Sequence, residues 1–341
     1  MRFIKTVFAL LIVGAIIAGA AAAYGWFWLN SEIAKPGPSL QPTEITIERG
    51  EGLASVASRL EAAGLVEDQR ILRLKARLDG IESDIKAGSY IVPERASIAD
   101  MLAQFVEGDV IEFRLTIPEG LTTAQILRRV EAAGDLTGDM PTRDFEEGVL
   151  LPDTYVFGAG TTRTQFIERM EDAQDALLDE IWETRQDDLP VSTPYEAVIL
   201  ASVVEKEIAK AEERDLVAGL FVGRLRRGMR LESDPTIIYG VSRGEPLYNR
   251  QGQRRTLYRS EIDRKTDWNT YQIDGLPKTP ICNPGRDAIA AVLNPPETDY
   301  VFFVADGQGG HLFAKTYAEH QRNVAAYRRF EREEIARERE N

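Results

Sequence analysis

The stretch ILASVVEKEIAK, residues 199–210, is an apolar helical pattern interrupted by a glutamate at position 205. A carboxyl group among apolar side chains is costly to ionise, so its pKa rises and it can act as a general acid near neutral pH. The alternative is that the helix reaches the surface at Glu205 and the carboxylate is solvated. At 100° per residue, the side chains nearest to Glu205 include Val198, Ala201, Ser202 and Ile208, which are small or apolar.

Two stretches after this helix are rich in residues that fix the backbone or form hydrogen bonds. Residues 217–240 and 267–285 hold many Gly, Pro, Asn and Tyr residues. Such loops are costly unless they shape a site. We therefore expect them to line a cleft, which favours a functional role for Glu205.

The first thirty residues predict a membrane anchor. Residues 7–29 form a run of 23 residues without a charge, and about 20 apolar residues are enough for a helix to cross the hydrocarbon core. Arg2 and Lys5 precede the run and Trp26–Trp28 closes it, which favours a cytoplasmic N-terminus and an aromatic belt at the far interface. The alternative is a cleaved signal peptide, since the small residues at 18–22 fit a cleavage site.

Composition narrows the classes of function. The 341 residues include 55 acidic and 41 basic side chains, a formal net charge of −14, and such a field repels phosphate backbones, so we expect no nucleic-acid partner. The two histidines, His311 and His320, match no metal-ligand spacing and suit no Ser-His-Asp triad. Cys282, the one cysteine, is expected to be a small buried packing residue. We therefore expect no metal and no cofactor, and we expect carboxylates to carry any catalysis.

A repeated unit organises the chain after the anchor. ITIERGEGLASVASRLEAAG (residues 45–64) aligns without gaps to LTIPEGLTTAQILRRVEAAG (residues 115–134), with nine of twenty residues identical. Each copy predicts a strand, a Gly turn and a helix. The repeat is either duplicated scaffold or a ligand-binding unit, because repetition alone specifies no site.

The pattern along the whole chain predicts an α+β fold. A β-α-α-β module follows a Pro-containing linker, and a larger, mainly helical part follows the module. Residues 299–316 predict two strands around a Gly-rich turn, before a helix from Tyr317. The predicted parts are a cytoplasmic tail (1–6), a transmembrane helix (7–29), a linker (30–44), the small module (45–109), the larger mixed α+β domain (110–327) and a charged, solvated C-terminal tail (328–341).

Five motifs carry a resemblance to a known family. They are EEGVLLPDTY (146–155), ASVVEKE (201–207), GMRLESDPTIIYG (228–240), WNTYQIDGLPKTPICNPG (268–285) and YVFFVADGQGGHLFAKTYAEH (300–320). In this order they resemble the YceG-like endolytic murein transglycosylases, and motifs of this length are specific. The module at 45–109 looks like the LysM-type subdomain of that family, and residues 110–327 look like its catalytic domain.

The resemblance implies an enzyme that cuts the β-1,4 bond between N-acetylmuramic acid and N-acetylglucosamine without water. It would leave a 1,6-anhydromuramyl end and terminate the elongation of nascent strands. Glu205 matches the catalytic acid/base in the VEKE motif of the family. The resemblance also implies a single-pass protein of the cell inner membrane with its bulk in the periplasm, peptidoglycan strands as substrate, no cofactor, and coordination with peptidoglycan synthases.

Seven further residues match motif positions of the family and are chemically suited to hold sugar hydroxyls and N-acetyl groups. The resemblance makes them candidates for substrate binding, although Asn-Pro-Gly and Asp-Pro-Thr segments equally often form turns and helix caps. The candidates are Glu147, Asp153, Tyr155, Asp234, Asn269, Tyr271 and Asn283.

Two positions depart from the family pattern. Gly223 stands where Asn is usual before Arg-Leu, and Glu232 stands where Gln is usual before Ser/Thr-Asp-Pro-Thr. The first loses an amide and the second adds a charge, so no substrate hydrogen bond is assigned to either. Glu232 is instead a candidate second carboxylate near the site.

Two other functions fit the same residues. A muramidase-type hydrolase would need a second carboxylate, and the candidates are Glu147, Asp234 and Glu232. A non-catalytic peptidoglycan-binding scaffold would use the repeated unit as its binder and leave Glu205 on the surface. The chemical form of the products and the effect of Glu205→Gln distinguish the three.

Overall fold

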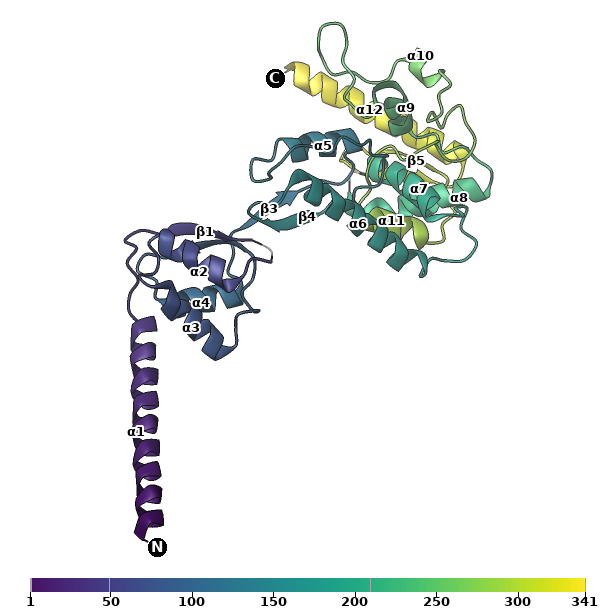
Figure 1. Ribbon diagram of the computed structural model, residues 1–341. Coiled ribbons are helices and arrows are strands. Elements are labelled where there is room, and N and C mark those ends of the chain that lie inside the picture. The colour runs from purple at the N-terminus through teal and green to yellow at the C-terminus, as the bar shows by residue number, and fades with distance from the viewer. Residues whose placement is uncertain (1, 49, 209, 341) are drawn as a thin grey trace. The chain divides into compact units, whose positions relative to one another are not determined.

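The computed structural model describes residues 2–48, 50–208 and 210–340 and has a mixed α+β fold (Figure 1). The chain divides into two compact units. The first comprises Met1–Phe113 with Val156–Gly160, and the second comprises Arg114–Tyr155 with Thr161–Asn341. The α+β class predicted from the sequence is confirmed.

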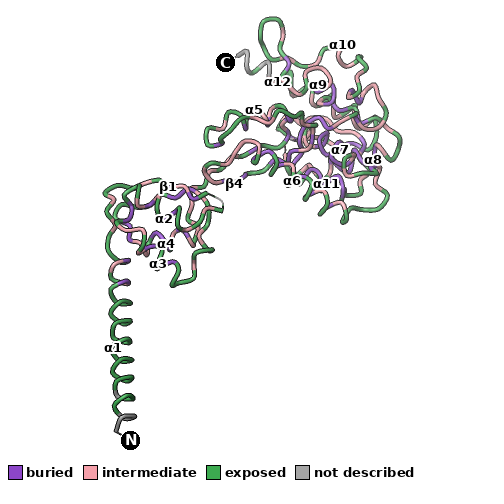
Figure 2. The backbone as a smooth tube through the Cα atoms, in the orientation of Figure 1, coloured by how far each residue is buried: buried purple, intermediate pink, exposed green. Residues whose placement is uncertain are grey.

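Helix α1 (Arg2–Ile33) contains the apolar run. Its stretch Thr6–Ile33 is long and apolar enough to cross a membrane by length and composition, and Figure 2 shows it exposed along most of its length. Leu29 and Ile33 are buried, and the Asn30 side chain donates a hydrogen bond of 2.8 Å to the helix backbone one turn earlier. These contacts carry the helix to Ile33 rather than to the predicted end at Leu29.

The rest of the first unit is a small two-stranded module. Strands β1 and β2 pair in antiparallel fashion, with Ile45 opposite Tyr90, and the helices bury their apolar sides in one core with them. The order of elements is the β-α-α-β order predicted for residues 45–109, followed by one helix. The likeness of this module to a LysM domain stays a prediction. The elements are β1 (Thr43–Ile47), α2 (Leu53–Ala62), α3 (Gln69–Asp79), β2 (Gly88–Val92) and α4 (Ile98–Glu107).

The second unit is mainly helical and carries two strand pairs. Strands β3 (Glu112–Thr116) and β4 (Thr154–Gly158) pair, and the boundary between the units runs through them. Strands β5 (Phe302–Ala305) and β6 (His311–Ala314) form an antiparallel hairpin, which confirms the two strands predicted at 299–316. The helices are α5 (Thr123–Glu131), α6 (Arg163–Trp182), α7 (Pro194–Glu207), the short 3₁₀ helix η1 (Ala211–Glu213), α8 (Arg214–Arg226), α9 (Asp234–Ser242), α10 (Arg259–Ile262), α11 (Arg286–Leu293) and α12 (Tyr317–Glu340).

Helix α7 is the centre of the core of the second unit. The Thr193 hydroxyl caps its start by accepting the N–H of Glu196 at 3.1 Å, with Pro194 in the first turn. Every residue from Ala197 to Val204 is buried, and α8 and α11 pack against this stretch (Figure 2). A helix that is apolar on all sides has to be covered on all sides. After this buried stretch, α7 next reaches solvent at Glu205, in its last turn.

The EEGVLLPDTY motif turns tightly against this core. Gly148 has φ +85°, in the left-handed region, and an added Cβ would lie 2.7 Å from Pro280 Cγ and 2.9 Å from Val198 Cγ1. Only glycine tolerates both the conformation and the lack of space. The turn thereby places Glu147 next to the segment that contains Asn283.

We predict that Gly148→Ala lowers the free energy of unfolding by about 2–4 kcal/mol, because a left-handed Cβ is strained and the core has no room for it. Urea denaturation of the purified protein measures this. Gly134→Ala is the matched control, since nothing lies within 4 Å of its added Cβ, and it should change the free energy by less than about 0.5 kcal/mol. Equal losses for the two variants would contradict the packing argument.

Candidate active site

Glu205 lies where α7 leaves the core, and its side chain is half-buried. Its Oε2 accepts the N–H of Gly285, the N-cap residue of α11, at 3.2 Å. Burial raises the pKa of Glu205, and the negative charge of Glu119 raises it further, whereas the Gly285 N–H, Arg214 and Lys206 lower it. Burial is the largest of these effects, so the carboxyl group favours its protonated form more than an ordinary glutamate does.

A second carboxylate lies beside Glu205, and the sequence analysis did not single it out. Glu119 belongs to the turn between β3 and α5, where Gly120 has φ +74°. Its carboxylate lies 3.6 Å from Arg214 Nη2, and Lys206 Nζ donates a hydrogen bond of 3.1 Å to the Gly120 carbonyl. The only sequence signal for Glu119 was its place at the Gly turn of the second repeat copy.

Two backbone hydrogen bonds join this turn to Asn283. The Gly120 N–H donates to the Asn283 carbonyl at 3.0 Å, and the Asn283 N–H donates to the Leu121 carbonyl at 2.8 Å. The Asn283 side chain is fully buried; its Oδ1 accepts the N–H of Leu150 at 2.9 Å and its Nδ2 donates to Thr123 Oγ1 at 3.0 Å. Asn283 thus fixes the position of the turn from both its backbone and its side chain.

Glu147 belongs to the same hydrogen-bond network. Its Oε1 accepts from the N–H of Thr123 at 2.5 Å, from Thr123 Oγ1 at 2.9 Å and from Asn283 Nδ2 at 3.1 Å. Its Oε2 accepts from the hydroxyl of Tyr239 at 3.0 Å. Burial raises the pKa of Glu147, while the hydrogen bonds from Thr123 and Tyr239 and the charge of Arg243 lower it. With four donors from the protein itself, this carboxyl group holds the surrounding loops together.

Tyr155 and Asp153 lie where β4 begins. The Tyr155 ring is buried edge-on against Phe166, and its hydroxyl donates to the Leu151 carbonyl at 2.8 Å. Asp153 is exposed, and its Oδ1 accepts the N–H of Thr154 at 2.6 Å. These contacts shape the start of the strand.

Asn269, Tyr271 and Asp234 form a separate group. Asn269 is fully buried, and its Nδ2 donates to the carbonyls of Ile262 at 3.0 Å and Arg264 at 2.6 Å. The Tyr271 hydroxyl donates to Asp234 Oδ1 at 2.9 Å near the surface. Within residues 2–48, 50–208 and 210–340, no hydrogen bond or ion pair links this group directly to Glu205. Of the seven predicted substrate-binding residues, the structure therefore places Glu147 and Asn283 in the network around the Glu119 turn.

Comparison with known proteins decides the family. The sequence profile of the YceG-like family matches residues 45–326. The chain belongs to the YceG-like family. The motifs that carry the resemblance in the sequence all lie within the matched residues.

Relatives of this YceG-like chain span much of its length. Two from Streptococcus pneumoniae, strains D39 and R6, are named endolytic murein transglycosylase; each is 30% identical over 367 residues, which cover 93% of this chain and 64% of the relative. A relative with the same name from Bacillus subtilis is 25% identical, and the alignment covers 92% of this chain and 91% of the relative. A crystal structure of a YceG-like protein from Listeria monocytogenes has a TM-score of 0.48 and 24% identity, over 83% of this chain and 99% of that one.

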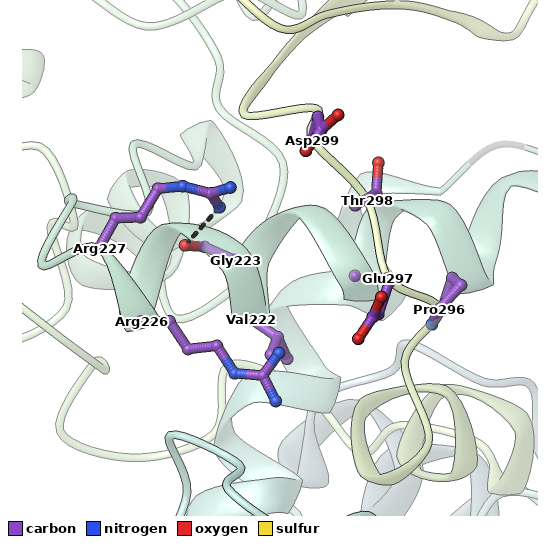
Figure 3. A pocket seen from close by; sticks show the side chains of 9 residues that line it. Val222, Gly223, Arg226, Arg227, Pro296, Glu297, Thr298 and Asp299 are labelled. Carbon is purple, nitrogen blue, oxygen red and sulfur yellow. Dashed lines mark hydrogen bonds between the residues drawn. The ribbon is translucent and has the colours of Figure 1, made fainter.

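The two departures from the YceG-like pattern lie on and after α8. Gly223 lines a cavity of about 530 Å³ together with Arg227, whose Nη1 donates to the Gly223 carbonyl at 2.9 Å (Figure 3). Glu232 lies 3.3 Å from the buried guanidinium of Arg224. None of the predicted site residues lines this cavity. A second cavity of about 440 Å³ is lined by Arg214, the residue that pairs with Glu119.

The cysteine and the histidines have packing and pairing roles. Cys282 is fully buried, as predicted, and its thiol donates to the Ser202 carbonyl at 3.4 Å. His311 Nδ1 lies 2.6 Å from Glu213 Oε2, and the His320 ring stacks on Phe302 with 5.2 Å between centroids. None of these side chains contacts Glu205 through a described hydrogen bond.

Glu207, the second glutamate of the VEKE motif, lies in a different environment from Glu205. Burial raises its pKa to about 7, against an ordinary value of 4.5, and Asp234 contributes to the rise, whereas Ser233 and Arg224 oppose it. Between pH 4.5 and about 7, the Glu207 carboxyl group is therefore protonated to a greater extent in the folded state than in the unfolded state. The contribution of Glu207 to the free energy of unfolding is fully present below pH 4.5 and is lost as the pH rises to about 7.

We predict that Glu207→Gln stabilises the protein at about pH 8, by at most about 3 kcal/mol, because the wild-type carboxylate is then charged in a partly buried site. The difference should vanish below about pH 4.5, where the carboxyl group is protonated in both states. Urea denaturation at a series of pH values measures it. Glu212→Gln at an exposed position is the control and should have an effect below about 0.5 kcal/mol throughout. A stability difference for Glu207→Gln that does not depend on pH would contradict the assignment.

Proposed function

We propose that this YceG-like chain is a membrane-anchored endolytic lytic transglycosylase. It cuts the β-1,4 bond between N-acetylmuramic acid and N-acetylglucosamine in nascent peptidoglycan, leaves a 1,6-anhydromuramyl end and stops elongation there. The observation that carries this proposal is the half-buried Glu205 carboxyl group with its raised pKa, at the end of a buried helix. Membership of the family and the names of the relatives support the same reaction.

Glu205 serves both proton transfers of this reaction. In its protonated form it donates a proton to the glycosidic oxygen while the bond from that oxygen to C1 breaks and positive charge develops at C1. The Gly285 N–H and the charges of Lys206 and Arg214 stabilise the carboxylate that forms. The carboxylate then accepts the proton of the muramyl 6-hydroxyl as that oxygen bonds to C1. Glu205 returns to its protonated form, and no water is consumed.

The seven candidate substrate-binding residues would act in two ways. Asp153 and Asp234 are exposed and can meet sugar hydroxyls directly. The other five have their polar groups bonded largely within the protein, so we propose that they fix the loops that face the strand. These five are Glu147, Tyr155, Asn269, Tyr271 and Asn283.

Glu205→Gln should lower the rate of strand cleavage by about two to four orders of magnitude, because an amide can neither donate nor accept the required proton. The assay is digestion of purified glycan strands followed by mass spectrometry, in which wild-type protein yields anhydro ends. Glu207→Gln, the same change in the same motif, is the matched control and should retain cleavage. Cleavage by Glu205→Gln at the wild-type rate, or none by wild-type protein, would instead favour a non-catalytic scaffold.

A muramidase-type hydrolase is the second candidate, because a second carboxylate, Glu119, lies beside Glu205. The carboxylates named from the sequence are engaged elsewhere: Glu147 by four donors, Glu232 by Arg224 and Asp234 by Tyr271. A hydrolase would give reducing ends that are heavier than anhydro ends by one water. Detection of such products would mean that the protein is a hydrolase and not a lytic transglycosylase.

We also propose that α1 anchors the protein in the cell inner membrane, with the N-terminus in the cytoplasm and the chain that follows α1 in the periplasm. Arg2 and Lys5 precede the apolar stretch Thr6–Ile33, as the positive-inside rule expects. Leu29 and Ile33 are buried at the end of this helix, so we expect the small module that follows α1 to lie close to the bilayer. Peptidoglycan synthases working on nascent strands at the same surface are the expected partners.

The LysM-like module would grip a strand while Glu205 cuts it some sugars away. We predict that full-length protein makes internal cuts and products of restricted length, and that a protein beginning at Val110 makes a broader distribution from the same long glycan. Chromatography of the products on a sizing column measures both. An unchanged distribution would remove the gripping role, and release of terminal disaccharides alone would contradict endolytic cleavage.

A further inference from the structure

Glu119, in the turn between β3 and α5, lies beside Glu205 but has no role in the proposed lytic reaction. The backbone of this turn is locked to Asn283 on one side, and Lys206 Nζ bonds to the Gly120 carbonyl on the other. A turn held from two directions presents its side chain in a defined place. Glu119 is therefore not a freely moving surface residue, although 41% of its side chain is exposed.

The carboxyl groups of Glu205 and Glu119 both lie next to Gly285. Its N–H donates to Glu205 Oε2 at 3.2 Å. An added Cβ at Gly285 would collide with the Glu119 carboxylate, and the three nearest atoms to that Cβ all belong to Glu119. Gly285 has φ −76°, which any residue adopts, so a larger residue here would be opposed by the Glu119 side chain and not by the backbone.

Arg214 completes the arrangement. Its side chain is 13% exposed and lies 3.6 Å from Glu119 Oε2 and 3.0 Å from Asp287 Oδ2. Its Nε is buried and has no hydrogen-bond partner among the described residues. The Arg214 guanidinium thus pairs with two carboxylates, those of Glu119 and Asp287. It forms no hydrogen bond or ion pair with Glu205 in the part of the chain that the structure describes.

We propose that Glu119 and Arg214 form a charge pair that sets the protonation state of Glu205 for its two proton transfers, an inference that rests on the proposed function. The negative Glu119 favours the protonated acid before cleavage and makes the carboxylate a stronger base afterwards. The positive Arg214 limits both effects, so that the proton can still leave. Glu119 and Arg214 are positioning residues, because they act through Glu205.

Other described groups also act on the charge of Glu205. Lys206 on α7 and the Gly285 N–H at the start of α11 favour the carboxylate. The buried thiol of Cys282 has a pKa held well above its ordinary value by burial, so it stays neutral. Of the described groups that act on the pKa of Glu205, Glu119 is the one that carries a negative charge. Its removal should therefore lower the pKa of Glu205, whereas removal of a positive charge should raise it.

The test is the pH dependence of kcat/KM for cleavage of purified glycan by the full-length protein. Activity falls at high pH as Glu205 loses its proton. In Glu119→Gln this alkaline limb should move to lower pH, and in Arg214→Gln it should move to higher pH. The double variant should bring the limb back toward the wild-type position, whereas Glu119→Asp and Arg214→Lys should keep it near the wild type. Shifts of opposite sign are not expected from a loss of structure.

Gly285→Ala provides an independent variant. Its Cβ should push the Glu119 carboxylate away while the Gly285 N–H remains, so the alkaline limb should move to lower pH as in Glu119→Gln. Asp263→Asn, which removes a charge paired only with Arg259 in the described chain, is the control and should leave the profile unchanged. If Glu119→Gln and Arg214→Gln leave the limb in place, or move it in the same direction, the charge-pair inference is overturned. Loss of activity in Glu205→Gln would still support the proposed function, so the two failures are distinguishable.

Discussion

The two backbone hydrogen bonds between Asn283 and residues 120–121 are the constraint on which the site depends. They join a turn near the start of the second unit to the segment that leads into α11. Because of them, Glu119 reaches the N–H end of α11 at Gly285, where Glu205 also arrives from α7. The charges around Glu205 are thus fixed by main-chain geometry and not by flexible side chains alone.

Burial of α7 is the second constraint on the site. A helix whose residues from Ala197 to Val204 are all covered gives its last turn a partly desolvated setting. Glu205 and Glu207 both lie in that last turn, and burial raises the pKa of each. Glu205 accepts the Gly285 N–H and lies beside the Glu119–Arg214 pair, whereas Glu207 is influenced by Ser233, Asp234 and Arg224. The two glutamates of one motif are therefore suited to different tasks.

Part of the fold and of the site could be predicted from the local pattern of the sequence. Apolar residues one turn from Glu205 made its desolvation one of two alternatives, and the pattern at 299–316 predicted β5 and β6. The role of Glu119 did not follow, because its contacts join positions far apart in the sequence and a Gly turn does not show what it packs against. The buried amide of Asn269 was equally invisible: its motif position suggested sugar binding, whereas its partners are backbone carbonyls. The extension of α1 to Ile33 depended on tertiary burial.

The central claim is that Glu205 is a carboxyl group held protonated above the range of an ordinary glutamate. The most direct measurement is a carbon-13 NMR titration of the glutamate side-chain carboxyl groups, with the Glu205 resonance assigned as the one that disappears in Glu205→Gln. The account predicts that this resonance titrates at a higher pH than the exposed glutamates of the same protein. A Glu205 resonance that titrates together with the exposed glutamates would contradict it.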